Sequence, residues 1–94
     1  MASKPPKGHF NVLYFAGASS YTGKDVESIA APLSLGELFV QLESRYPGIG
    51  AKILVSCLVT VNLEYVDVPS AEGEEGPTLN EFDEVAIIPP VSSG

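Results

Sequence analysis

Asp83-Glu-Val-Ala-Ile-Ile-Pro-Pro90, near the carboxyl end of the sequence, is the stretch that decides the fold. After its acidic start it is apolar through Ile88, a pattern typical of a strand that is buried on both faces. Pro89 and Pro90 end the strand, because proline has no backbone N–H to donate to a neighbouring strand. We therefore expect this last strand at the centre of a sheet.

A second strand of the same character is predicted over 9–16, which is rich in aromatic and β-branched residues. Its apolar side chains fall on both faces, with Phe10, Val12 and Tyr14 on one and Leu13 and Phe15 on the other. This strand is therefore also expected to be central. Shorter strands are predicted at three further places: 26–30, 58–62 and 63–68. A tight reversal near Asn62 joins the last two of them.

One amphipathic helix is predicted between these strands. Ser34-Leu-Gly-Glu37 fits a capping box, and Pro47-Gly48 is a stop signal. Apolar residues recur between them at helical spacing: Leu35, Leu38, Phe39, Leu42 and Tyr46. Residues 49–55 fit either a further helical turn or the start of a strand. Turns or loops are expected at 17–24, 70–77 and 78–81.

The predicted order is β-β-α-β-β-β. Two central strands, one near each end of the chain, are expected to lie side by side and parallel, with the helix over one face of the sheet. This is the β-grasp (ubiquitin-like) arrangement of the α+β class, a mixed sheet covered by one main helix. We expect a flexible leader over 1–8, the β-grasp domain over 9–90 and a flexible tail over 91–94.

Composition excludes several classes of function. The 94 residues include 5 Lys and Arg against 12 Asp and Glu, so the formal net charge is −7. Such a chain is a poor binder of nucleic acid or of anionic membranes, but it suits a partner with a basic face. One cysteine allows no internal disulfide, and one cysteine with one histidine cannot close a zinc site. No apolar run reaches 18 residues and no signal peptide is recognisable, so a cytoplasmic location is expected.

Few residues of the predicted body offer chemistry, and no metal site is expected. Cys57 lies in an apolar run without a basic neighbour, so we interpret it as a buried thiol rather than a reactive thiolate. His9 is interpreted as a solvated residue at a strand end. Glu72, Glu74 and Glu75 could bind a hard cation in principle, but they lack the spacing of a calcium loop and are interpreted as solvated.

The carboxyl-terminal stretch is the more promising feature. Pro89 and Pro90 favour an extended path, and small residues follow them: Val91, Ser92, Ser93 and Gly94. A narrow tail of this kind can enter the active site of another protein, where a terminal carboxylate would be the reactive group. The alternative is an ordinary chain terminus.

Three stretches resemble the small, sulfur-carrier subunit of molybdopterin synthase, the MoaD type: Asn11-Val-Leu-Tyr-Phe-Ala16, Thr60-Val-Asn-Leu-Glu-Tyr-Val66 and Asp83-Glu-Val-Ala-Ile-Ile-Pro-Pro-Val91 with a final Gly. The resemblance spans about 9–94. It implies that a separate activating enzyme adenylates Gly94 at the expense of ATP and that sulfur then gives a thiocarboxylate. It further implies that the tail enters the large subunit and donates sulfur to a cyclic pyranopterin monophosphate. No permanently bound cofactor is expected, and two small and two large subunits are implied.

Two residues depart from the family pattern. Ser93 stands where the family usually has glycine, and Phe82 stands where glycine often precedes the last strand. Phe82 is a candidate partner contact, with packing under loop 70–77 as the alternative. Phe15 is another, with core packing as the alternative. Two other functions remain open on the sequence: a ubiquitin-like modifier joined to lysines through Gly94, and a β-grasp interaction domain without tail chemistry.

Overall fold

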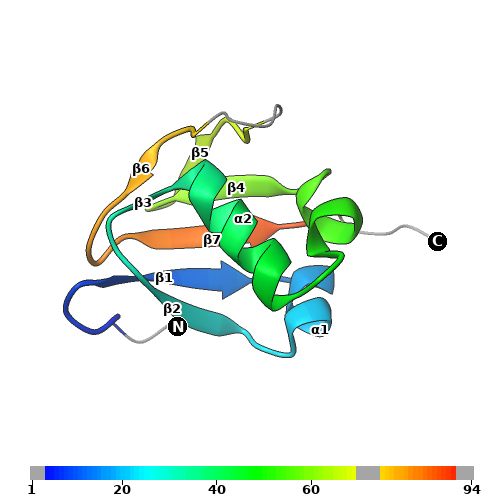
Figure 1. Cartoon of the computed structure of the whole chain (residues 1–94), viewed down its shortest axis with the longest axis horizontal. Helices are drawn as coiled ribbons and strands as arrows, with labels where there is room; N and C mark the ends of the chain where they lie inside the picture. The colour runs from blue at the N-terminus through cyan, green and yellow to red at the C-terminus, as the bar shows by residue number, and fades with distance from the viewer. Residues whose placement is uncertain (1–3, 70–74, 91–94) are drawn as a thin grey trace.

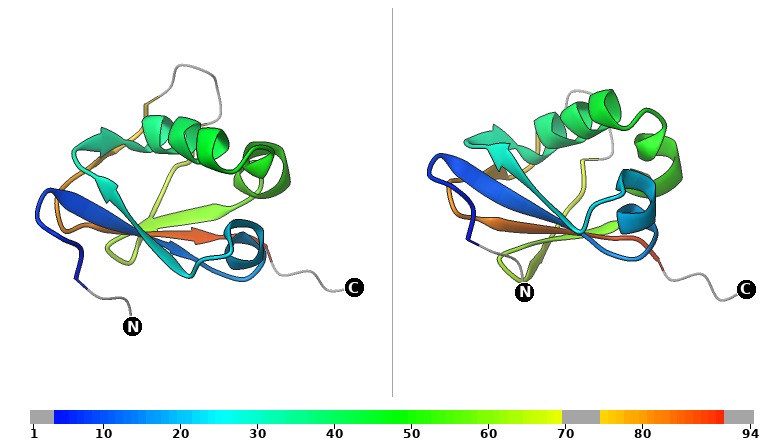
Figure 2. Two further views of the ribbon diagram at one scale, coloured as in Figure 1. Left: turned by 60° about the horizontal axis from the view of Figure 1, so that its bottom comes forward. Right: turned by 90° about the horizontal axis from the view of Figure 1, so that it is seen from below.

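A computed structural model describes residues 4–69 and 75–90, which form a five-stranded sheet with a helical layer on one face (Figures 1 and 2). The strand order in the sheet is β2-β1-β7-β4-β5. These strands are β1 (His9–Tyr14), β2 (Val26–Ala30), β4 (Leu58–Val61), β5 (Glu64–Val66) and β7 (Glu84–Ile88). The remaining elements are α1 (Gly17–Thr22), β3 (Leu33–Ser34), α2 (Leu35–Arg45), the π-helix η1 (Gly50–Leu54) and β6 (Thr78–Leu79).

The prediction that one strand near each end of the chain pairs at the centre of the sheet is confirmed. β1 and β7 are parallel, with Val12 aligned to Val85 and Leu13 to Ala86. β2 and β4 flank them in antiparallel orientation, and β5 is the outer strand beside β4. The described residues therefore have the predicted β-grasp topology, a mixed sheet with its two parallel strands at the centre.

The predicted cap and apolar stripe of the main helix are both confirmed. The Ser34 hydroxyl accepts from the Glu37 N–H at 3.1 Å, and the Glu37 carboxylate accepts from the Ser34 N–H at 3.2 Å. This reciprocal pair satisfies backbone donors that the first helical turn leaves free. One face of the helix is buried against the sheet in a core that includes Leu35, Leu38, Leu42, Phe10, Val12, Val85 and Ile87.

Two segments that were predicted to be turns form short regular elements instead. Residues 17–22 form α1 instead of a turn, because burial of Ala18 in the core outweighs the modest helix propensity of the serines around it. Residues 78–79 form β6, which pairs with β3 and buries Leu79 completely. Over 49–55, where helix and strand were both open, the chain forms η1. These segments are too short for periodicity to reveal them.

Residues 1–3, 70–74 and 91–94 lie outside the described part, so the predicted mobility of leader and tail stays a prediction. The described end of the leader contacts the body, where the Gly8 N–H donates to the Glu81 carboxylate. Across the described ranges, no helix is long and apolar enough to cross a membrane.

Candidate functional site

The base of the predicted tail is fixed at one edge of the sheet. Because β1 and β7 are parallel, their carboxyl ends meet at this edge. Ile88 is aligned with Leu58 of β4, and Pro89 after it is buried, whereas Pro90 is exposed. The described chain thus reaches the surface at Pro90. The predicted tail residues themselves lie outside the described part: Val91, Ser92, Ser93 and Gly94.

Phe15 lies at the same edge as the tail base. Its backbone N–H donates to the Ile87 carbonyl at 3.2 Å, and its side chain is 47% exposed. With Leu13 and Val26 it lines a hollow of about 860 Å³ at the carboxyl end of β1. Core packing, the alternative considered for Phe15, is therefore excluded, and its role as a partner contact stays a prediction.

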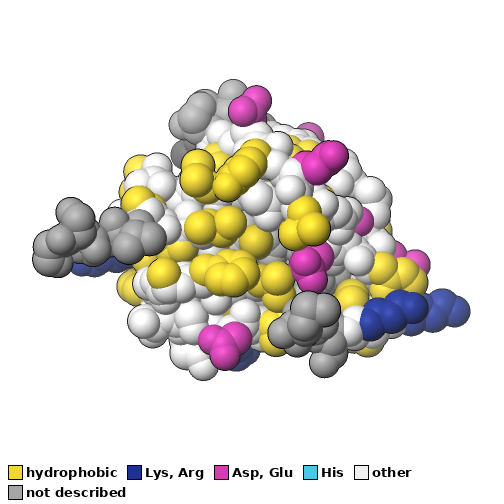
Figure 3. All heavy atoms as spheres, turned by 180° about the vertical axis from the view of Figure 1, so that it is seen from behind, with side chains coloured by type: hydrophobic (Ala, Val, Ile, Leu, Met, Phe, Trp, Pro, Cys, Tyr) yellow, Lys and Arg dark blue, Asp and Glu magenta, His cyan; other side chains and the backbone are white. Residues whose placement is uncertain are grey.

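The face of the sheet opposite α2 carries an apolar patch, which we call the open sheet face. Figure 3 views the molecule from this side and shows hydrophobic side chains gathered across its centre. Strand alternation and exposure assign four of them to the patch: Phe15, Val26, Leu58 and Tyr65. Exposed apolar area of this kind is typical of a protein interaction surface.

Phe82 lies far from this edge along the central strand. It precedes β7, whereas Pro89 follows it, so the structure does not bring Phe82 together with Phe15 and the tail base. Its side chain is 45% exposed, and the Lys4 ammonium lies 4.8 Å from the centre of its ring. The backbone φ of Phe82 is 69°, in the left-handed region that favours glycine. The resemblance implies glycine at this position, and glycine would adopt this backbone conformation without strain.

The strain at Phe82 gives a testable expectation. Phe82→Gly and Phe82→Ala both remove the ring and its contact with Lys4, but only glycine also relieves the left-handed backbone. We expect the glycine variant to be more stable than the alanine variant by about 1 kcal/mol, or roughly 5 °C in Tm. Paired thermal melts measure the difference, and an alanine variant that melts at or above the glycine variant would contradict it.

Catalytic groups are scarce among the described residues. Cys57 is buried, as predicted, and burial raises the pKa of its thiol to about 11, so it is no thiolate at neutral pH. Its Sγ donates to the Leu54 carbonyl at 3.5 Å. No cluster of three or more His, Cys, Asp or Glu within 4–69 and 75–90 is placed to hold a metal ion. Of the three glutamates considered for a cation, Glu75 is exposed, and Glu72 and Glu74 lie outside those ranges.

A buried polar cluster around Glu27 was missed by the sequence reasoning. One Glu27 oxygen accepts from the hydroxyls of Tyr14 and Tyr46 at 2.8 and 2.9 Å. The other accepts from Arg45 at 2.6 Å and Lys24 at 3.3 Å. Burial alone would raise the pKa of Glu27, but the hydrogen bonds from the two tyrosines and Arg45 outweigh it, so that pKa is lowered. The signal was the alternation in 26–30, which places Glu27 on the core face beside Ile29.

Similarity to known proteins shows which family this chain belongs to. A family model described as the ThiS family matches residues 12–94, which include both central strands and the tail base. The chain belongs to the ThiS family. Its sequence is 58% identical to the molybdopterin synthase sulfur carrier subunit of Pyrenophora tritici-repentis, over 97% of this chain and 96% of that protein. It is 55% identical to the protein of the same name from Phaeosphaeria nodorum, over the full length of both.

A solved structure shares the fold of this chain. The solution structure of small archaeal modifier protein 1 from Methanosarcina acetivorans superposes with a TM-score of 0.70 and 20% sequence identity, over 95% of this chain and 99% of that one. This likeness confirms the predicted β-grasp fold, and the sequence identities given above confirm the resemblance to sulfur-carrier subunits.

Proposed function

We propose that this chain is the sulfur-carrier subunit of a molybdopterin synthase and serves molybdenum cofactor biosynthesis. One observation carries the proposal: identity of 55–58% along almost the whole chain to two proteins that bear this name. The described body fits the role, because it offers a firmly anchored tail base, with Ile88 paired to Leu58 of β4.

In this proposal the terminal carboxylate of Gly94 is the reacting group. An activating enzyme joins the Gly94 carboxylate to AMP from ATP and releases pyrophosphate, which makes the carboxyl carbon a good acyl electrophile. A nucleophile at the oxidation level of sulfide displaces AMP and leaves a thiocarboxylate. That sulfur then passes to a cyclic pyranopterin monophosphate in the large subunit, and water returns the acyl group of Gly94 to a carboxylate. ATP is thus consumed by the activating enzyme, and the carrier itself holds no cofactor.

The tail base and the open sheet face have separate roles in docking. We infer that the large subunit covers the open sheet face while the tail, Pro89 to Gly94, enters its active site. Support comes from the position of Phe15 and Leu58, which are exposed beside the strand end that leads to Pro90. The −7 charge favours a basic docking face on the large subunit or the activating enzyme. Two carriers on a dimer of large subunits complete the proposed assembly.

The two alternative functions gain no specific support. The modifier whose structure superposes on this chain is only 20% identical to it, so that likeness concerns the fold alone. A plain interaction domain would account for the open sheet face, but it would not explain the Pro-Pro-Val motif or the final glycine.

Intact mass spectrometry tests the proposal. The chain is incubated with ATP, its activating enzyme and a sulfur donor, and we expect the mass increase of one oxygen replaced by one sulfur, localised to Gly94 by fragmentation. Omission of ATP is the control, since no acyl adenylate can then form. An unchanged mass with an enzyme that is active on another carrier would contradict the proposal, and adducts on lysines of other proteins would favour the modifier.

A further inference from the structure

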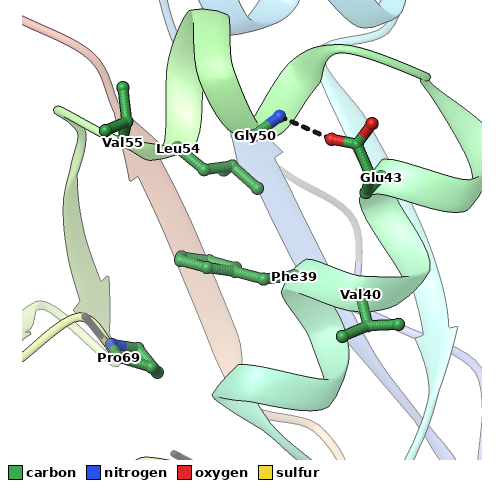
Figure 4. A pocket seen from close by; sticks show the side chains of 7 residues that line it. All are labelled: Phe39, Val40, Glu43, Gly50, Leu54, Val55 and Pro69. Atoms are coloured by element: carbon green, nitrogen blue, oxygen red, sulfur yellow. Dashed lines mark hydrogen bonds between the residues drawn. The ribbon is translucent and has the colours of Figure 1, made fainter. Parts of the chain in front are cut away.

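A second apolar hollow lies on the helical side of the molecule, away from the open sheet face. We call it the α2–η1 groove. Its volume is about 370 Å³, near the lower end of the range for ligand pockets. Figure 4 shows Phe39 of α2 pointing into the space bounded by Leu54 of η1 and by Pro69. The full lining is Phe39, Val40, Glu43, Gly50, Leu54, Val55 and Pro69.

Two valines that line this groove are largely exposed to solvent. Val40 is 71% exposed in the middle of α2, and Val55 is 76% exposed just after η1. Neither side chain contributes to the core, and valine is not a favoured residue for an exposed helical position. Exposed apolar side chains around a hollow are a feature of surfaces that bind a partner.

The rim of the groove is acidic. Glu37 and Glu43 lie three positions before and three positions after Val40 along α2, so the two exposed carboxylates flank it on the helix surface. Within 4–69 and 75–90, neither of them forms an ion pair with a lysine or arginine. A neighbouring hollow that shares Pro69 is lined by Asp67 and Glu75, so acidic side chains around the groove outnumber the one basic side chain of η1, Lys52.

The orientation of Glu43 is fixed rather than free. Its two carboxylate oxygens accept from the backbone N–H groups of Gly48 and Gly50, at 2.7 and 2.9 Å. These hydrogen bonds lower the pKa of Glu43, so the side chain is charged at neutral pH. A carboxylate held in place beside an apolar hollow can receive a lysine or arginine without losing further side-chain entropy.

We propose that the α2–η1 groove is a docking site for a basic amphipathic helix of a partner protein, separate from the open sheet face and the tail. An apolar side chain of that helix enters the hollow between Phe39 and Leu54, and Val40 and Val55 flank it. Lysines or arginines one turn away meet the carboxylates of α2, as in other helix-in-groove complexes. Charge complementarity selects this occupant over a neutral or acidic segment.

A peptide probe tests this docking site on the full chain. The probe is a synthetic helix of about 15 residues with leucine along one stripe and lysine and arginine on its flanks. Two comparison peptides replace the basic residues by glutamate or the leucines by serine. With isotope-labelled protein, we expect the first peptide to shift the backbone amide signals of α2 and η1, and the comparison peptides to leave them in place.

Matched apolar variants separate docking from general attraction to an acidic protein. Val40→Ser should weaken peptide binding about tenfold, as for an apolar anchor of an interface, whereas Leu63→Ser at the β4–β5 turn should change it less than about twofold. Equal effects of Val40→Ser and Leu63→Ser, shifts centred on the open sheet face, or equal binding of the serine peptide would each overturn the proposal.

Matched charge variants test the acidic rim. Glu37→Gln should weaken peptide binding about threefold, and Glu64→Gln on β5 should leave it unchanged. Glutamine at position 37 can still accept from the Ser34 N–H and complete the capping box, so the helix start is kept while the charge is removed. Equal weakening by the two glutamine variants would show that only the overall charge of the chain matters, and it would overturn the charge-matched docking site.

Discussion

Deletion of Gly94 should abolish molybdopterin formation while leaving the carrier folded and able to bind the large subunit. The deletion withdraws the terminal carboxylate by about 3.5 Å, the length of one extended residue. A misplacement of about 1 Å at a reacting centre already costs about 100-fold in rate, so we expect a loss of at least that size. The measurement is product formation from the cyclic pyranopterin monophosphate by the reconstituted synthase, with the activating enzyme, ATP and a sulfur donor present.

The control for this deletion is Leu63→Ser. Leu63 is 85% exposed in the β4–β5 turn, at the end of the sheet opposite to Pro89, so its replacement should leave sulfur transfer unchanged. Complex formation between the deletion variant and the large subunit, measured by calorimetry, shows that the body is intact. A deletion variant that still yields product at the normal rate would contradict the assignment of Gly94 as the sulfur site.

The elements that could be predicted from the sequence are those with strong local signals. The apolar run of 83–88 and the mixed run of 9–16 indicated the central pair, and the Ser34–Glu37 spacing indicated the helix start. α1 and β6 could not be predicted, because each is stabilised by the burial of one residue in the core, Ala18 and Leu79 respectively. Burial of that kind is a tertiary effect that no short sequence window contains.

The candidate site, too, could be predicted from the sequence only in part. The motif at the carboxyl end pointed to the tail, and alternation along β1 placed Phe15 and Leu13 on one face of the strand. The separation of Phe82 from Phe15 follows from the parallel pairing of β1 with β7, which was predicted, because a residue before β7 and a residue after β1 lie at opposite ends of that pair. The α2–η1 groove could not be predicted, because it depends on how η1 packs beside α2, and 49–55 was ambiguous in the sequence.

Glu27→Ala should lower the free energy of unfolding by about 3 kcal/mol, or roughly 15 °C in Tm. The substitution leaves the hydroxyl of Tyr14, a residue only 3% exposed, without its acceptor, and it removes the link from β2 to Arg45 and Tyr46 near the end of α2. Glu27→Gln is the matched variant. Its amide oxygen can still accept from the tyrosines while Arg45, about half exposed, turns to water, so we expect a loss of only about 1 kcal/mol.

The pH dependence of these variants identifies the carboxylate as the source of the stability. Glu27 has a lowered pKa in the folded chain, so its contribution is present above the ordinary glutamate pKa of about 4.3 and is lost as the pH falls through the lower, folded value. The stability difference between the wild-type chain and Glu27→Gln should therefore be constant near pH 7 and shrink below about pH 4. Denaturant unfolding at a series of pH values measures it. A difference that stays the same or grows on acidification would mean that the cluster stabilises the fold through packing of Tyr14 and Tyr46 rather than through the charge of Glu27.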